Sequence, residues 1–244
     1  DGVTLVDTKI KGYGQDILAE VRPITDKPVT TIINTHTHWD HSGSNPEFPD
    51  SVNFVAHENT RAQMARATCQ PVTNCDAFKG THAEYLPTTT FSGRKSLFDG
   101  DDQIDLYHFG RGHTDGDTFV VFRNARTMHT GDMFQRLGMP FIDVANGNGS
   151  AVEFGSTLMR AVDGIKNVDT VIAGHHTVTV PWNTFVNFSG FFNDVLRKAT
   201  EGMASGHSVE QVVEAYEKPD QFSDFQAPPR GVTTLVQNIY NESQ

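Results

Sequence analysis

Short runs of β-branched and aromatic residues recur along the chain and predict strands. Gly, Pro, Asn or Asp bounds each run, as is typical of strands that end in turns. The strand-like segments are residues 3–7, 29–35, 52–57, 103–109, 118–123, 126–131 and 170–175. The sequence RNAR at 123–126 predicts a hairpin turn between two of these strands.

Apolar residues at helical spacing predict helices near both ends of the chain. The helix-like segments are residues 14–22, 58–67, 151–165, 185–204, 208–217 and 231–242. Ser208 followed by Gln211 has the pattern of a capping box at the start of one of them. This order of elements predicts an α/β (α+β) layered fold in which helices cover sheets, and we expect one domain over residues 1–244.

Charge narrows the classes of partner that we expect. The chain has 244 residues and a formal net charge of −11, which disfavours nucleic acid and anionic membranes as partners. No run approaches the ~18 apolar residues of a membrane span. We therefore expect a small-molecule substrate, no nucleic acid and no membrane, whereas the sequence leaves the oligomeric state open.

Two cysteines bear on the compartment. Cys69 and Cys75 stand in CQPVTNC, where a small disulfide loop and two free thiols are equally compatible with the sequence. An oxidising compartment follows only from the disulfide. The chain opens with DGVTLVDT, in which no signal peptide is visible. A periplasmic or secreted location is thus an expectation tied to the disulfide, and a cytoplasmic one stays open.

Four metal-ligand side chains crowd into the segment INTHTHWDHSG at 33–43, which follows a strand that we expect to be buried. They are His36, His38, Asp40 and His41. Residues i and i+2 of an extended chain share one side, so His36 and His38 can point to one spot. Imidazoles and carboxylates suit zinc, manganese or iron. A chance polar loop is disfavoured, because burying so many uncompensated polar groups costs several kcal/mol.

Three further donors follow later strands. His113 stands in GRGHTDGD, Asp132 in MHTGDMF and His175 in IAGHH, each beside a glycine. A lone histidine or aspartate at a strand end is more often structural. Together and in this order, the three residues indicate ligands that complete the first cluster.

The ordered motifs HTHWDH, GHTDGD, TGD and AGH resemble the metallo-β-lactamase superfamily, from residue 1 to about 180. The resemblance implies a four-layer αββα sandwich with a metal site at one end of the paired sheets, and further strands before residue 1. It implies that one metal is held by His36, His38 and His113 and a second by Asp40, His41 and His175, with Asp132 as the bridge. Seven donors with one shared carboxylate suit two metals.

The chemistry that the resemblance implies is metal-dependent hydrolysis. Two zinc ions, with iron or manganese as alternatives, would activate a bridging water to attack an ester, lactone, thioester or amide/β-lactam carbonyl. Asp40 and Asp132 are the expected catalytic residues. Asp132 differs from the cysteine of the best-known zinc β-lactamases and resembles the branches of glyoxalase II, lactonases and phosphodiesterases, so we expect low efficiency on β-lactams.

Two rival functions share the motif. The first is a mononuclear iron oxidoreductase of the persulfide dioxygenase type. The second is a non-catalytic scaffold that has kept its ligands, which an intact donor set with an open position disfavours.

Several other residues are predicted to surround the site. We expect Asp117 to accept a hydrogen bond from a ligand histidine, and Phe141, Met139 and the 134–150 loop to cover the substrate. His57 is expected either behind the ligands or at the surface, and Trp39 either at the floor of the pocket or in packing. We expect His108 and His129 to pack within strands, and Phe185, Phe188, Phe191 and Phe192 to lie in the core.

Overall fold

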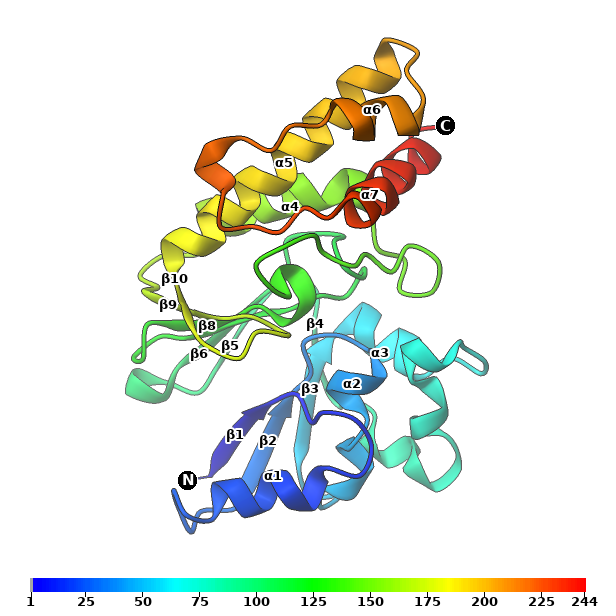
Figure 1. The fold of residues 1–244 in the computed structure, drawn as a ribbon. Helices are drawn as coiled ribbons and strands as arrows, with labels where there is room; N and C mark the ends of the chain where they lie inside the picture. Colours follow the sequence, from blue (N-terminus) through cyan, green and yellow to red (C-terminus); the bar gives the residue numbers. More distant parts are fainter. Residues whose placement is uncertain (1) are drawn as a thin grey trace.

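Two stacked β-sheets form the centre of the computed structural model, which describes residues 2–244 (Figure 1). The first sheet is parallel throughout and has the strand order β1-β2-β3-β4. Its strands are β1 Val3–Val6, β2 Val29–Ile33, β3 Asn53–His57 and β4 Thr89–Phe91. Parallel order brings the carboxyl ends of these strands to one edge of the sheet.

The second sheet is mixed and has the order β10-β9-β8-β7-β6-β5. Its strands are β5 Arg94–Leu97, β6 Ile104–Tyr107, β7 Phe119–Phe122, β8 Thr127–His129, β9 Thr170–Ile172 and β10 Val180–Pro181. Only β8 and β9 pair in parallel, so Asp132 and His175 both follow carboxyl ends that face the same way.

Helices cover the outer face of each sheet and complete four layers (Figure 1). The α-helices are α1 Gly14–Val21, α2 Trp39–Ser42, α3 Glu58–Met64, α4 Ala151–Gly164, α5 Trp182–Ala204, α6 Val209–Ala215 and α7 Pro229–Glu242. The short 3-10 helices are η1 Asn45–Glu47, η2 Pro71–Thr73, η3 Cys75–Phe78, η4 Gly80–Tyr85, η5 Gly100–Asp102, η6 Gly131–Phe134 and η7 Asp220–Phe222. Within residues 2–244, no helix combines the length and the apolar character that a bilayer span requires.

Alternation along the strands separates the apolar side chains into layers. Ile33 of β2 packs between the sheets with Leu106 and Val120. Its neighbour Ile32 packs with Phe54 on the outer face of the first sheet, which α1 covers. The largest core lies between the second sheet and α4–α7. It includes the four predicted core phenylalanines of α5, each with 0% of its surface exposed: Phe185, Phe188, Phe191 and Phe192.

The predicted layered fold is confirmed, together with the hairpin between β7 and β8 and the capping box at Ser208. Four elements were missed. Residues 89–97 form β4 and β5, whose sequences TTF and RKSL lack an apolar run because both are edge strands. The two-residue β10 is too short to have a pattern, and α2 lies inside the histidine motif. Helix α5 begins at Trp182 rather than 185, directly after Pro181.

Candidate metal centre

The seven predicted donors converge at one edge of the paired sheets. β2 leads into the segment of His36 and His38, and the short helix α2 then turns Asp40 and His41 toward the same edge. The loops after β6, β8 and β9 bring in His113, Asp132 and His175. Three groups of donor atoms form, and within each group the atoms lie within 4.8 Å of one another.

The first group, here called the buried triad, consists of His36, His38 and His113. Their exposed fractions are 0%, 3% and 0%. His38 Nδ1 lies 3.0 Å from His113 Nε2. The Nε2 atom of His36 is buried and has no hydrogen-bond partner among the described residues, which is costly for a polar atom unless a ligand occupies its lone pair.

The second group, here called the open triad, consists of Asp40, His41 and His175. His41 Nε2 lies 3.3 Å from His175 Nε2, and His175 Nε2 lies 3.4 Å from Asp40 Oδ2. The side chains of His175 and Asp40 are 35% and 28% exposed, so this triad is accessible from solvent.

Asp132 lies between the two triads. Its Oδ1 is 3.2 Å from His41 Nε2, whereas its Oδ2 is 3.2 Å from His175 Nε2 and 3.6 Å from His113 Nε2. Gln135 Nε2 donates a hydrogen bond of 3.0 Å to the same Oδ2. The carboxylate therefore contacts a histidine of the buried triad and histidines of the open triad.

Two carboxylates, the buried Asp143 and the partly buried Asp7, hold the outer nitrogens of candidate ligand histidines. Asp143 Oδ2 lies 2.9 Å from His38 Nε2, and Asp7 Oδ2 lies 2.7 Å from His41 Nδ1. A carboxylate at the outer nitrogen fixes that nitrogen as the N–H donor, so the inner nitrogen keeps a free lone pair. Neither aspartate was among the residues predicted from the sequence. The signal for Asp7 was its position at the carboxyl end of the first strand, whereas Asp143 carried none.

Neutral oxygens hold the other two histidines of the buried triad. His113 Nδ1 lies 2.8 Å from the carbonyl oxygen of Phe141, and His36 Nδ1 lies 3.0 Å from Thr35 Oγ1. Gln135 Oε1 accepts the Phe141 N–H at 3.0 Å, so this glutamine links Asp132 to the carbonyl that orients His113.

Burial separates the protonation behaviour of the histidines. It lowers the pKa of His36 well below the ordinary value and that of His113 to about 4, against the charge of Asp132. Burial also lowers the pKa of His41, but the Asp7 and Asp132 carboxylates outweigh it and leave that pKa raised. The hydrogen bond to Asp132 raises the pKa of His175.

The Asp132 carboxylate stays ionised. Burial opposes this, but hydrogen bonds with His175 and His41 hold the pKa of Asp132 well below its usual range. Neutral imidazoles and an ionised carboxylate are the protonation states that metals bind. The unpartnered His36 Nε2 and the convergent donor set therefore fit divalent-metal binding.

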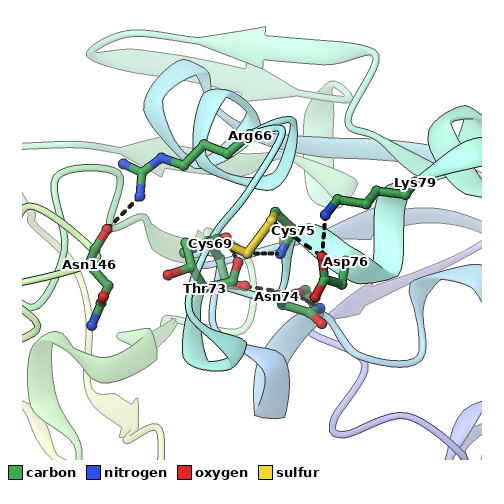
Figure 2. Close-up of a disulfide and its surroundings, with 10 residues drawn as sticks. Arg66, Cys69, Thr73, Asn74, Cys75, Asp76, Lys79 and Asn146 are labelled. Carbon is green, nitrogen blue, oxygen red and sulfur yellow. Dashed lines mark hydrogen bonds and ion pairs between the residues drawn. A yellow bond between two sulfur atoms is a disulfide. The ribbon is translucent and has the colours of Figure 1, made fainter.

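A disulfide loop braces the segment that carries the ligands (Figure 2). Cys69 and Cys75 are bonded, which decides between the two readings of CQPVTNC. Inside the loop, the Thr73 carbonyl accepts the Thr37 hydroxyl at 2.7 Å, and Asn74 Nδ2 donates to Ser42 Oγ at 2.8 Å. The loop thus holds both ends of the segment that contains His38 and His41.

The same region reaches the loop of Asp143. Arg66 donates to the Asn146 carbonyl at 2.6 Å (Figure 2), and Asn146 N–H donates to Asp143 Oδ1 at 3.0 Å. Two sets of contacts therefore hold His38 in place. The disulfide loop holds Thr37 and Ser42 on either side of it, and Asn146 holds its partner Asp143.

A cavity of about 470 Å³ adjoins the open triad. Its lining residues are Val6, Asp7, Lys9, Ile10, Tyr13, Asp40, His41, His129, Gly174 and His175. Next to the buried triad, Phe141 is 53% exposed, and the centre of its ring lies 5.7 Å from that of His113 and 6.3 Å from that of His38. The open triad thus faces a space suited to a small molecule.

Some expectations about surrounding residues were wrong. Asp117 binds no ligand histidine: its carboxylate accepts the N–H and the hydroxyl of Thr114, which stabilises the turn after His113. Met139 packs against the largest core rather than over the site. Neither position could be predicted from the sequence, because tertiary contacts decide where these side chains point. The turn after His113 directs Asp117, and the helix layer directs Met139.

Three histidines outside the two triads make structural contacts, and one of them also lines the cavity. His57 is buried, contacts the Ser92 carbonyl at 3.0 Å and stacks on His108, so it lies neither behind the ligands nor at the surface. His129 accepts the Gly131 N–H and also lines the cavity. Trp39 is 47% exposed and is not part of the cavity lining.

Comparison with known proteins agrees with the fold. The family model of the metallo-beta-lactamase superfamily matches residues 1–176, and the chain belongs to this superfamily. This membership implies a divalent-metal site and indicates an enzyme, often a hydrolase.

Among solved structures, a metallo-beta-lactamase from Pontibacter korlensis is similar, with a TM-score of 0.63 and 19% identity over 79% of this chain and 82% of that one. The DIM-1 metallo-beta-lactamase gives 0.62 and 16%, over 79% and 82%. A double mutant of the sec-alkyl sulfatase PisA1 gives 0.71 and 12%, over 99% of this chain and 46% of that one. These likenesses show the fold.

A curated relative is more similar in sequence over a shorter stretch. It is the 2,4-dinitroanisole O-demethylase subunit alpha of Nocardioides sp. (strain JS1661), which is 32% identical over 108 residues. The match covers 43% of this chain and 29% of that protein, so the chain spans less than a third of the relative that it matches.

Proposed function

We propose that this protein is a hydrolase of small molecules that uses two divalent cations, with zinc as the metal. The observation that carries the proposal is the placement of Asp132, whose carboxylate oxygens contact His113 of the buried triad and both histidines of the open triad. A single shared carboxylate between two sets of three donors suits two metals rather than one.

The ligand roles follow from the two triads. His36, His38 and His113 would hold the first ion, Asp40, His41 and His175 would hold the second, and Asp132 would contact both. When bound, such ions lower the pKa of a water between them toward neutrality and polarise a carbonyl or its leaving group.

The protein's own groups orient the reaction. Asp40 is partly exposed and lines the cavity, so its carboxylate is placed to orient an attacking water and to accept its proton. The water oxygen forms a bond to the carbonyl carbon, the bond to the leaving group breaks, and the proton passes to the leaving group. Phe141 and the cavity would contact the substituents on either side of that carbon.

The substrate class that we propose is an ester, lactone, thioester or amide, with β-lactams as poor substrates. The fold neighbours include β-lactamases, but Asp132 stands where the best-known zinc β-lactamases have a cysteine. The Cys69–Cys75 disulfide supports a periplasmic or secreted location, because disulfides persist in oxidising compartments.

The test compares Asp132→Asn with Asp169→Asn, which removes the same charge at an exposed residue paired with Arg126. Hydrolysis of para-nitrophenyl esters, lactones and a chromogenic β-lactam is measured before and after chelation and after zinc is returned. We expect the wild type and Asp169→Asn to lose activity on chelation and to regain it with zinc, and Asp132→Asn to stay inactive. Retained turnover in Asp132→Asn, or turnover of none of these substrates by the wild type, would overturn the proposal.

A further inference from the structure

The cavity beside the open triad is lined by a positively charged side chain that has no role in the fold or in the metal-ligand set described above. Among the lining residues, Lys9 is the one lysine or arginine side chain. We propose that Lys9 binds an anionic group of the substrate, so that the preferred substrate is a small carboxylate-bearing molecule whose scissile carbonyl lies at the open triad. This inference rests on the proposed hydrolase function and adds the chemical class of its substrate.

The backbone of Lys9 has a conformation that is more typical of glycine than of lysine. Its φ is 61°, in the left-handed region, where a lysine costs energy that a glycine would not. Strain of this kind clusters at functional sites, and here it lies beside the candidate metal centre. Asp7, two positions earlier, also has a φ of 61°, and its side chain holds the ligand His41.

Hydrogen bonds fix this segment to the helix that carries two ligands of the open triad. The Lys9 carbonyl accepts the Gly43 N–H at 2.9 Å, and Thr8 N–H donates to the His41 carbonyl at 2.7 Å. The position of Lys9 relative to Asp40 and His41 is therefore set by the backbone, which is what recognition of one substrate at two points requires.

The ammonium group of Lys9 is available to a ligand. It lies 5.1 Å from the centre of the Tyr13 ring, and no carboxylate of residues 2–244 lies within ion-pair distance of it. The neighbouring acids have other partners: Asp7 accepts from His41 and Thr35, and Glu47 accepts the N–H groups of Gly12 and Gly14.

Charge on the whole molecule makes a local cation necessary for an anionic substrate. The chain has a formal net charge of −11, which repels anions at long range. A lysine at the wall of the cavity opposes that field over the short distance at which binding occurs. The apolar side chains of Val6 and Ile10 and the ring of Tyr13 provide an apolar part of the wall that suits a short hydrocarbon linker.

The experiment uses two esters that differ in one end of the acyl chain. Mono(para-nitrophenyl) succinate ends in a carboxylate, and para-nitrophenyl butyrate ends in a methyl group. The variants are Lys9→Gln, Lys9→Arg and the control Lys11→Gln, which removes the same charge at an exposed lysine outside the cavity lining. The quantity measured is the ratio of kcat/KM for the succinate ester to that for the butyrate ester.

We expect Lys9→Gln to lower this ratio by about tenfold through KM, as loss of one charge-assisted contact does. Lys9→Arg should restore most of it, and Lys11→Gln should leave it at the wild-type value. An unchanged ratio in Lys9→Gln, or an equal fall in Lys11→Gln, would overturn the inference.

A binding measurement separates this inference from the proposed function. Para-nitrophenoxybutyrate is the ether analogue of the succinate ester and has no carbonyl to hydrolyse. Its Kd for the zinc-loaded protein, measured by calorimetry, should rise about tenfold in Lys9→Gln and stay constant in Lys11→Gln. If neither ester is hydrolysed but this difference is found, the hydrolase proposal fails and the anion site stands. Equal Kd values in the wild type and Lys9→Gln would overturn the anion site, whatever the turnover.

Discussion

The buried triad and the open triad lie on either side of one carboxylate, yet they differ in access. The buried triad consists of imidazoles that are at most 3% exposed. The open triad replaces one imidazole with a carboxylate and leaves the His175 side chain 35% exposed beside a cavity. On the proposed function, we expect the buried triad to anchor the metal centre and the open triad to face the substrate.

The two triads also differ in how strongly protons compete with metal. Burial lowers the pKa of His36 and His113, whereas carboxylates raise the pKa of His41 and His175. A metal must displace a proton from a histidine of raised pKa but not from one that is already neutral. We therefore expect the buried triad to hold its ion more tightly, most clearly at acidic pH.

The largest effect is expected when the buried triad loses a ligand. His113→Ala removes a donor that no neighbouring side chain can replace, so metal content should fall and kcat/KM should drop by more than the roughly 100-fold limit for loss of an outer partner. Elemental analysis and ester hydrolysis measure the two effects. The control is His207→Ala, an exposed histidine between α5 and α6, and wild-type metal content in His113→Ala would contradict the assignment.

Exchanging the outer carboxylates should affect one triad at a time. Asp143→Asn removes the charged partner of His38, and Asp7→Asn removes that of His41. Each change should raise the dissociation constant of one metal ion by about 10–100-fold. We expect this for the more tightly bound ion in Asp143→Asn and for the more weakly bound ion in Asp7→Asn. Competition with a chromophoric chelator measures both dissociation constants. If both variants changed the same constant, the assignment of one outer carboxylate to each triad would be refuted.

Lowering the pH should empty the open triad first. The pKa of His175 and of His41 is raised above the ordinary 6.5 in the metal-free protein, so both nitrogens bind protons already near neutrality. The pKa of His113 is about 4, so its nitrogen stays free of protons between about pH 7 and pH 5. Metal content after dialysis across this range should fall from two ions to one, and simultaneous loss of both would count against the comparison.

The smallest effect on the metal centre is expected from the disulfide. Replacing Cys69 and Cys75 by serine removes the constraint on a short loop and should lower the free energy of unfolding by about 2 kcal/mol, measured by denaturant titration. Because Thr73 and Asn74 still reach Thr37 and Ser42, both metals should be retained. Loss of the tighter-bound ion in the double variant would show instead that the disulfide itself holds the buried triad.

The seven donors could be predicted from the sequence because each follows a strand and because their order resembles a known family. The residues behind them could not all be found in this way. Asp143 is one acid in an irregular loop, and only the tertiary fold brings it to His38. Asp117 had the better sequence argument, since it follows His113 closely, yet the turn directs it to Thr114. The edge strands β4 and β5 have too few apolar residues to be recognised.

The most direct test of the central claim is to count metals per chain in protein that is purified without added metal. Elemental analysis should give about two zinc ions per chain for the wild type, one for each triad. About one iron and little zinc, together with oxygen uptake on a persulfide substrate, would contradict the dinuclear hydrolase and favour the iron oxidoreductase that shares the histidine motif.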